Sequence, residues 1–293
     1  MPRFSRAQIA RRRRIAAAIL AAALVLVLGA CSILVTRALT TAFTMPEVHE
    51  ANNAAATVAS TPADARSRTQ LLGDTELAEG EAMGIDVSVH QGTIDWQGVA
   101  ADGYSFAYIK ATEGANYTDP QFEANWTGAQ AEGVTVGAYH YFTLCSSGAA
   151  QARDFLATVP VGDAHLPPAL DLEFDGACDE RPEASRAQAE IDDFLRIVEA
   201  EWGRRAVIYS SREWREHYGL PAADGRPDWL FSDTGRPETD DWSVWQFRFD
   251  GEVTGIEGPV DIDVVRIEEL RSHATLSEAD REELARALKD AGL

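Results

Sequence analysis

Residues 168–174 read Pro-Ala-Leu-Asp-Leu-Glu-Phe, an apolar segment that carries two acidic side chains. Alternate residues of a β-strand point to the same face, so Asp171 and Glu173 share one side of a strand and Leu172 lies on the other. An unpaired charge is costly to bury, and acids placed in an apolar strand are typical of functional sites. A lone acid is usually a solvated surface group, but this pair predicts a buried site with two carboxyl groups.

Seven further segments of similar texture, rich in β-branched and aromatic residues, indicate strands on either side of this one. They are residues 84–89, 106–112, 134–142, 206–211, 228–233, 243–249 and 261–266. Helix-like stretches separate several of them, most clearly residues 184–202, where apolar residues recur at helical spacing. Strands that alternate with helices favour a parallel sheet, and eight of them predict an α/β fold with a TIM-like (β/α) barrel. The last connections are too short for full helices, so we expect an irregular barrel.

The acidic residues gather where such a barrel has its active site, at the converging C-terminal ends of the strands. Asp86 lies on the first predicted strand, Asp171 and Glu173 on the fourth, and Asp261 and Asp263 on the last. Two carboxyl groups with separated pKa values are what glycoside hydrolysis requires. The pattern therefore points to a glycosidase.

The N-terminal segment has the composition of a membrane anchor. Residues 1–37 hold seven Arg and no acid, and residues 15–36 form an uncharged run rich in Ala, Leu and Val. A run of this length can span a bilayer, and the Arg cluster before it favours a cytoplasmic N-terminus. We expect a single-pass protein of the cell membrane with an extracytoplasmic catalytic domain. Residues 27–31 resemble a lipobox, so the alternative is a lipoprotein anchored at Cys31; the apolar residues after Cys31 favour the uncleaved span.

Composition divides the chain into four parts. Residues 1–37 are the Arg-rich tail and membrane segment, and residues 38–81, poor in aromatic residues and without hydrophobic periodicity, are expected to be a flexible stalk. Residues 82–271 are the catalytic barrel, and residues 272–293 are a C-terminal helix that begins after Ser277 as N-cap.

Charge excludes one class of partner. The chain has a net charge of −21. Seven of its 26 basic residues lie in the first 37 positions, so residues 38–293 contain 19 basic and 47 acidic residues. Nucleic-acid binding depends on neutralising phosphates with Lys and Arg, so we expect no nucleic-acid partner.

Two cysteines lie in the exported part of the chain, where disulfides are permitted. Cys145 and Cys178 each follow a predicted strand, the third and the fourth, which are neighbours in a barrel. We expect a disulfide between them; two free thiols are the alternative.

The first hundred residues of the exported part carry a family resemblance. The residues that do so in order are Asp86-Val87, Gln91-Gly92, Gly103, Tyr108-Ile109-Lys110, Thr112-Glu113-Gly114, Tyr117 and Asp119-Pro120. Later blocks are residues 137–142, 168–173, Trp245-Gln246 and 260–263. Together they resemble glycoside hydrolase family 25, the N-acetylmuramidase type of lysozyme, over roughly residues 82–271. The resemblance implies hydrolysis of β-1,4 bonds between N-acetylmuramic acid and N-acetylglucosamine in bacterial peptidoglycan.

The resemblance also implies roles for single residues. Glu173 is expected to be the general acid, and Asp171 to orient the substrate's N-acetyl group or stabilise the charge that develops at the anomeric carbon. Asp86 and Asp261 match the family's two other active-site acids. The family usually has Asn at the position of Asp263, which leaves open which of the two late acids faces the site.

Aromatic residues near these acids are candidates for stacking on sugar rings, with the barrel core as the alternative for each. They are Tyr139, Tyr141, Tyr209, Trp229 and Trp245. The six His, including His140, show no ligand-like spacing, and no glycine loop suited to phosphate is present. We therefore expect no metal and no cofactor.

Two other functions compete with this one. A catalytically weak wall-binding barrel would keep the aromatic groove and lose the acids, whereas this chain keeps them. A barrel glycosidase acting on a related N-acetylated glycan, such as a chitinase, would carry the run DxxDxDxE on its fourth strand, and residues 167–173 lack the earlier acids of that run.

Overall fold

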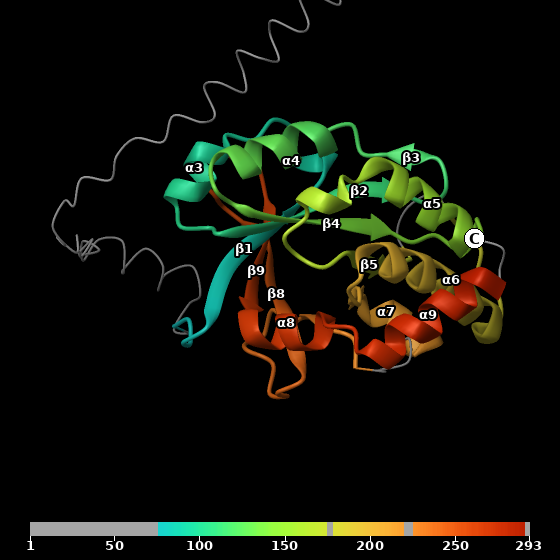
Figure 1. Cartoon of the computed structure of the whole chain (residues 1–293). Coiled ribbons are helices and arrows are strands. Elements are labelled where there is room, and N and C mark those ends of the chain that lie inside the picture. The colour runs from blue at the N-terminus through green and yellow to red at the C-terminus, as the bar shows by residue number, and fades with distance from the viewer. Residues whose placement is uncertain (1–75, 175–177, 220–224, 291–293) are drawn as a thin grey trace, which may run out of the picture. The chain divides into compact units, whose positions relative to one another are not determined.

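The computed structural model describes residues 76–174, 178–219 and 225–290 of the 293-residue chain (Figure 1). The strands in these ranges are β1 (Glu81–Val87), β2 (Phe106–Glu113), β3 (Tyr117–Thr118), β4 (Thr135–Tyr141), β5 (Ala169–Leu172), β6 (Val207–Ser210), β7 (Asp228–Phe231), β8 (Trp242–Gly251) and β9 (Val260–Arg266). The α-helices are α3 (Trp96–Ala101), α4 (Phe122–Ala131), α5 (Gly148–Thr158), α6 (Ala184–Trp202), α7 (Arg212–Tyr218), α8 (Ile267–Ala274) and α9 (Glu278–Asp290). Two 3₁₀ turns occupy Val89–Gln91 and Val161–Asp163.

Eight of the strands close into a barrel. Their order is β1-β9-β8-β7-β6-β5-β4-β2, and the pairing of β2 with β1 completes the ring, while the short β3 adds only to the edge of β2. The neighbours from β1 through β2, β4, β5, β6 and β7 to β8 are parallel. The predicted α/β barrel is therefore confirmed, and each predicted strand overlaps an observed one.

The last strand departs from a regular (β/α) barrel. Strand β9 runs antiparallel to both β8 and β1, because only eight residues connect it to β8 and a parallel crossover needs a dozen or more. We expected the acids of this strand near its C-terminal end. Asp261 is instead the second residue of β9. Because β9 runs in the reverse direction, its N-terminal end lies on the same side of the barrel as the C-terminal ends of the other strands.

Apolar side chains form two layers, one on each side of the barrel wall. The outer layer fills the space between the strands and the helices, which in Figure 1 lie around the outside of the sheet, α3 and α4 beside β1, β2 and β4. The inner layer contains Phe106, Tyr108, Leu166, Ala169, Val207, Trp229, Val244, Val265 and Leu270. It fills one end of the barrel and leaves the other to polar side chains.

Helix α6 agrees with its sequence prediction at both ends. It spans Ala184–Trp202, and the apolar residues at helical spacing are buried: Ala187, Ile191, Phe194, Leu195, Val198 and Trp202. Gly203 ends the helix in the left-handed conformation, with a φ of 64°, which glycine adopts without strain. Phe194 of this helix stacks on His140, so α6 covers the outer face of the barrel at β4, the neighbour of the strand that carries Asp171.

Two further local predictions are confirmed. Cys145 and Cys178 form a disulfide that ties the connection after β4 to the connection after β5. Ser277 caps α9, because its hydroxyl accepts a hydrogen bond from the Asp280 backbone amide at 3.1 Å and its own amide donates to the Asp280 carboxylate at 2.9 Å. Helix α8, directly after β9, was not predicted.

The predicted membrane segment at residues 15–36 and most of the predicted stalk lie outside the described residues. Among the helices that the structure does describe, none is both long and apolar enough to cross a bilayer.

Candidate active site

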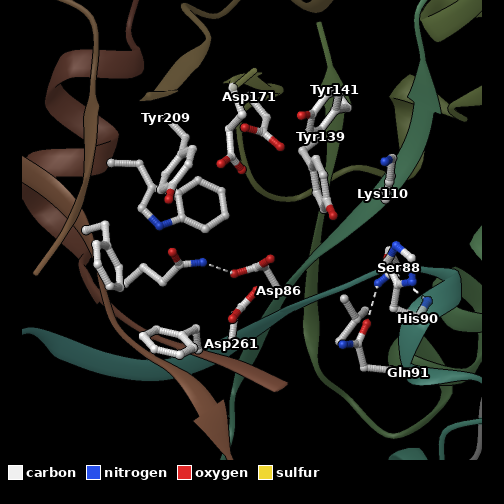
Figure 2. A pocket seen from close by; sticks show the side chains of 16 residues that line it. Asp86, Ser88, His90, Gln91, Lys110, Tyr139, Tyr141, Asp171, Tyr209 and Asp261 are labelled. Carbon is white, nitrogen blue, oxygen red and sulfur yellow. Dashed lines mark hydrogen bonds between the residues drawn. The ribbon is translucent and has the colours of Figure 1, made fainter. Parts of the chain in front are cut away.

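A cavity of about 370 Å³ opens at the end of the barrel where the parallel strands have their C-termini. Figure 2 shows three of its carboxyl groups, Asp86, Asp171 and Asp261, directed into one space. The lining residues come from every strand of the barrel wall and are Asp86, Val87, Ser88, His90, Gln91, Lys110, Tyr139, Tyr141, Asp171, Glu173, Tyr209, Trp229, Phe231, Gln246, Phe249 and Asp261.

Strand alternation places the acids. In β5, Leu170 and Leu172 are fully buried in the outer core, so Asp171 between them points into the barrel. Glu173 follows the last residue of β5, is only partly buried, and lines the cavity mouth. Asp86 on β1 is paired in register with Asp261 on β9. The structure thus brings together all four acids that the sequence predicted.

Burial and mutual repulsion make these carboxyl groups hard to ionise. Burial, with the negative charges of Glu173 and Asp86, raises the pKa of Asp171 well above its usual range. Burial also raises the pKa of Asp86, aided by Asp263 and Glu173, and brings the pKa of Asp261 to about 9, aided by Asp86 and Glu173. A cluster that cannot ionise completely retains protons near neutral pH, which is the condition for general acid catalysis.

Asp171 and Glu173 interact directly. A side-chain hydrogen bond between them contributes to the raised pKa of Asp171, and one oxygen of Asp171 is buried with no hydrogen-bond donor among the described residues. Two carboxyl groups can form such a bond only when one of them is protonated, since a carboxylate cannot donate. The half-buried Glu173 therefore lies in front of a deeper acid.

Asp263 lies deeper than the other acids. It is fully buried with an exposed fraction of 0%, does not line the cavity, and accepts a hydrogen bond from the Trp229 indole nitrogen at 2.9 Å. Asp261 and Asp263 are alternate residues of β9 and share its inward face. The question left open by the sequence is thereby answered: both acids face inward, and Asp261 is the one that reaches the cavity.

Lys110 on β2 brings a cation to the cavity wall. Its ammonium group donates to Glu113 at 2.7 Å and lies 4.5 Å from the centre of the Tyr141 ring. Its positive charge lowers the pKa of Asp171, against the larger effects of burial and neighbouring acids. Lys110 thus limits how strongly Asp171 holds its proton.

Four of the five predicted aromatic residues line the cavity, and one does not. Tyr139, Tyr141, Tyr209 and Trp229 are lining residues, although Trp229 is almost completely buried and held by Asp263. The prediction for Trp245 is wrong, because its neighbour Gln246 occupies the inward position on β8. Trp245 points outward, packs in the outer core, and donates its indole N–H to the Ser232 carbonyl at 2.9 Å.

Several lining residues were not found from the sequence. Gln246 donates to Asp86 at 2.7 Å, and Ser88 and Gln91 form a reciprocal cap on the turn after β1. Phe231 and Phe249 pair at the rim with ring centres 6.0 Å apart. Lys110 could have been found from the sequence, because it is a charged residue in an otherwise apolar strand. The loop residues Ser88 and Gln91 are recognisable only from their place at the barrel mouth.

No group of three His, Cys, Asp or Glu side chains in the described ranges is arranged to hold a metal ion. His140 is buried in the outer layer, where its two ring nitrogens contact the Thr112 hydroxyl at 2.7 Å and the Gln151 side-chain oxygen at 2.9 Å. Burial lowers the pKa of His140 to about 3, so the ring is neutral.

Comparisons with known proteins show what this chain is similar to. The family model of the glycosyl hydrolases family 25 matches residues 85–256. The uncharacterized protein YegX of Escherichia coli K12 is 38% identical over 200 residues, which cover 64% of this chain and 72% of YegX. Lysozyme M1 of Streptomyces globisporus is 37% identical over 198 residues, which cover 61% and 65% of the two chains.

A solved structure extends the likeness to the fold. The family 25 glycosyl hydrolase of Bacillus anthracis superimposes with a TM-score of 0.59 at 32% sequence identity, over 65% of this chain and 91% of that one. The family-model match includes Asp86, Asp171 and Glu173 and ends before β9, the strand that carries Asp261. This chain therefore belongs to the glycosyl hydrolases family 25 and is a glycoside hydrolase.

Proposed function

We propose that this protein is a lysozyme that hydrolyses the β-1,4 bond between N-acetylmuramic acid and N-acetylglucosamine in bacterial peptidoglycan, with Glu173 as the general acid. The observation that carries the proposal is the contact between the half-buried Glu173 and the buried Asp171 at the mouth of an acid-lined cavity. A relative named as a lysozyme, 37% identical, supports the choice of substrate.

Glu173 suits the proton donor better than its neighbours because it is the acid at the cavity mouth. The glycosidic oxygen of a polymer that crosses the barrel passes over this mouth, while Asp171 lies two residues earlier in the chain and is more deeply buried. Donation of the Glu173 proton to that oxygen lets the C–O bond break, and the leaving sugar departs with a new hydroxyl group.

Muramic acid carries its own nucleophile, the 2-acetamido group. Its carbonyl oxygen attacks the anomeric carbon as the glycosidic bond breaks, and the Asp171 carboxylate accepts the acetamido N–H and stabilises the positive charge of the cyclic intermediate. Water then attacks the anomeric carbon, gives its proton to the Glu173 carboxylate, and reopens the ring with retained configuration. Asp86 and Asp261 hold the floor of the site, and Tyr139, Tyr141 and Tyr209 are the ring surfaces available for stacking.

Digestion of purified peptidoglycan tests the bond that is cut. We expect mass spectrometry of the borohydride-reduced products to find new reducing ends on muramic acid, and proton NMR to find the β-anomer first. New reducing ends on glucosamine would contradict the muramidase proposal. Binding to the glycan without release of fragments would favour the wall-binding alternative, and cleavage of chitin oligosaccharides but not peptidoglycan would favour the related-glycan alternative.

We further propose that the catalytic domain is held outside the cell by the uncharged segment at residues 15–36, as a single-pass membrane protein. The Arg residues before this segment and its length support the orientation. The Cys145–Cys178 disulfide supports an oxidising compartment for the barrel. Mass spectrometry of the N-terminal peptide from the native host decides the anchor, and a diacylglyceryl group on Cys31 with residues 1–30 missing would replace this proposal by lipidation.

A further inference from the structure

A second cavity, of about 620 Å³, lies at the end of the barrel opposite the active site. Its wall includes the first residues of β2 and β4, Phe106 and Thr135, and the second residue of β1, Ala82. Val265, near the end of the antiparallel β9, joins them, and residues of helices α8 and α9 complete the wall. The proposed hydrolysis uses no residue of this second cavity.

The floor of the second cavity is apolar. Phe106, Leu166, Val265 and Leu270 belong to the inner layer of the barrel core, and all four line the cavity. Ile267 of α8 also lines it and remains 39% exposed, although it is a large apolar residue. An exposed apolar side chain beside an apolar cavity is typical of a binding surface.

The charged side chains around this apolar floor are basic. Arg204, Arg271 and Arg281 line the second cavity and are exposed, together with His165, and no described Asp or Glu lines it. This local excess of positive charge occurs in a chain with 47 acidic and only 26 basic residues. Guanidinium groups bind phosphate through two parallel hydrogen bonds, so the cavity is suited to a phosphate joined to an apolar group.

Two of the three arginines keep a charge that the protein does not neutralise. Arg271 pairs with Glu268 at 2.6 Å, whereas no carboxyl group of the described chain forms an ion pair with Arg204 or Arg281. The Arg204 guanidinium donates to the His165 backbone carbonyl at 2.9 Å. This bond holds the Arg204 side chain beside the cavity and leaves its positive charge uncompensated.

The chain enters the barrel at the same end as the second cavity. The described residues begin at Glu76, five residues before β1, and Ala82 of β1 lines the cavity. The segment proposed to cross the membrane, residues 15–36, comes earlier in the sequence. A domain tethered to a membrane meets its lipids at a high effective concentration, so a weak lipid site on that domain is occupied.

We propose that the second cavity binds an anionic phospholipid of the membrane to which the chain is anchored. Arg204 and Arg281 bind the phosphate, and the apolar floor takes the adjoining part of an acyl chain. Binding holds the N-terminal end of the barrel on the membrane, so that the active-site cavity at the other end faces the cell wall. Lipid binding is a function beyond the proposed hydrolysis, and the proposed anchor enters only as the reason that lipid is within reach.

Hydrogen exchange measured by mass spectrometry tests the lipid site on the full-length protein in micelles of a non-ionic detergent. Dioleoylphosphatidylglycerol is added to the micelles, and dioleoylphosphatidylcholine at the same mole fraction is the comparison lipid. Lipid in a mixed micelle reaches the cavity whether or not residues 15–36 form the anchor. The Arg205 backbone amide donates to the Ala274 carbonyl beside the cavity, so a bound lipid should slow exchange there. We expect at least about threefold slower exchange in residues 203–206 and 270–276 with phosphatidylglycerol, and little change with phosphatidylcholine.

Paired substitutions show whether the arginines of the cavity bind the lipid. The double variant Arg204→Gln/Arg281→Gln should lose the slowing by phosphatidylglycerol. The matched control Arg153→Gln/Arg186→Gln removes two exposed arginines from α5 and α6 and should keep it. Turnover on soluble glycan fragments should be the same in both variants and the wild type, because none of the four residues lines the active-site cavity. Failure of the lipid site is thereby distinguishable from failure of the lysozyme proposal.

Three results would overturn the lipid site: no slowing by either lipid, equal slowing by both, or slowing that persists in Arg204→Gln/Arg281→Gln. Inorganic phosphate that slows exchange as much as phosphatidylglycerol would overturn it too, because the apolar floor would then play no part. If the double variant does not fold, salt gives the answer. About 0.5 M NaCl should reduce the slowing severalfold in the wild type, since ions screen the attraction between arginine and phosphate. Slowing that salt leaves undiminished would contradict a lipid held by its charge.

Discussion

The two faces of strand β4 adjoin buried polar groups that differ in how completely they are hydrogen-bonded. Tyr139 and Tyr141 point toward the acid cluster inside the barrel, while His140 between them points outward to helices α5 and α6. Both ring nitrogens of His140 have partners, and Gln151 in turn receives the Thr143 amide and donates to the Thr143 and Ser146 carbonyls. In the acid cluster, Asp171 and Asp263 each keep a buried oxygen that meets no donor within the described part of the chain.

This difference in hydrogen bonding distinguishes a polar cluster that stabilises the fold, around His140, from one that is suited to catalysis, the acid cluster. A fully paired network fixes one arrangement and has nothing left with which to bind a substrate. An incompletely paired network is strained electrostatically and holds labile protons, which is useful only where chemistry needs them. The two clusters should therefore respond differently to substitution, in activity at one and in stability at the other.

The largest expected effect belongs to the acid at the cavity mouth. Glu173→Gln is nearly isosteric but has no carboxyl proton to donate, so turnover on peptidoglycan should fall by about 10² to 10⁴. Because Glu173 is only partly buried, we expect the thermal midpoint to change little. Turbidity loss of cell-wall suspensions measures the rate, and circular dichroism checks the fold. Near-normal turnover by a folded variant would move the donor role to Asp86 or Asp261.

Breaking the His140 cluster should have the opposite outcome. Gln151→Leu removes the partner of the His140 ring and of the Thr143 backbone, which leaves buried polar groups unpaired at a cost of about 1–3 kcal/mol of unfolding free energy. Turnover per folded molecule should stay within about twofold of the wild type, because no atom of Gln151 lines the cavity. Denaturant unfolding measures the change in unfolding free energy. Turnover per folded molecule requires a protein concentration that is determined without an activity assay. A large loss of turnover in fully folded protein would contradict the separation of the clusters.

The two clusters should also give stability opposite dependences on pH. The pKa of His140 is about 3 in the folded protein and about 6.5 in an unfolded chain, so between these values the unfolded state binds the extra proton and stability falls as pH falls. The expected loss is up to about 1.4 kcal/mol per pH unit. Urea unfolding from pH 6.5 to 4 should show this slope in the difference between the wild type and His140→Gln, because the acid cluster contributes equally to both proteins. The acid cluster, with raised pKa values, acts in the other direction and lowers stability as pH rises.

The smallest expected effects distinguish an inward from an outward aromatic residue. Phe249 is 60% exposed at the cavity rim, so Phe249→Ala should raise KM severalfold and change the unfolding free energy by less than about 0.5 kcal/mol. Trp245→Phe should leave KM unchanged and cost about 1 kcal/mol, through the lost bond to the Ser232 carbonyl and lost packing. Steady-state kinetics with soluble glycan fragments and urea unfolding measure the two quantities. A reversed pattern would place Trp245 in the binding groove.

Local patterns determined much of the fold before any coordinates. Runs of β-branched and aromatic residues located eight strands, and helical spacing located α6 at both ends, because strand and helix periods are properties of neighbouring residues. Asp171 and Glu173 were recognisable for the same reason, since they are charged residues in an otherwise apolar segment. The disulfide followed once two strands were taken as neighbours.

Other features depended on contacts between residues distant in the chain. The antiparallel direction of β9 is set by its short connection to β8, and it brings Asp261 to the cavity from the opposite end of its strand. Trp245 and Gln246 are adjacent in the sequence, and only the register with β7 and β9 decides which of them faces the barrel. The protonation of the acids, too, is a property of the assembled cluster, because burial and repulsion act only when β1, β5 and β9 come together.

The sequence by itself therefore determined the strands, the acidic residues and the family they resemble, since these are encoded in short segments and their spacing. Only the tertiary structure decided which acids line the cavity, which aromatic residues face it, and that His140 is a neutral structural group. The physical reason is that side-chain direction is fixed by strand register, and proton affinity by burial and by charges brought close from other strands.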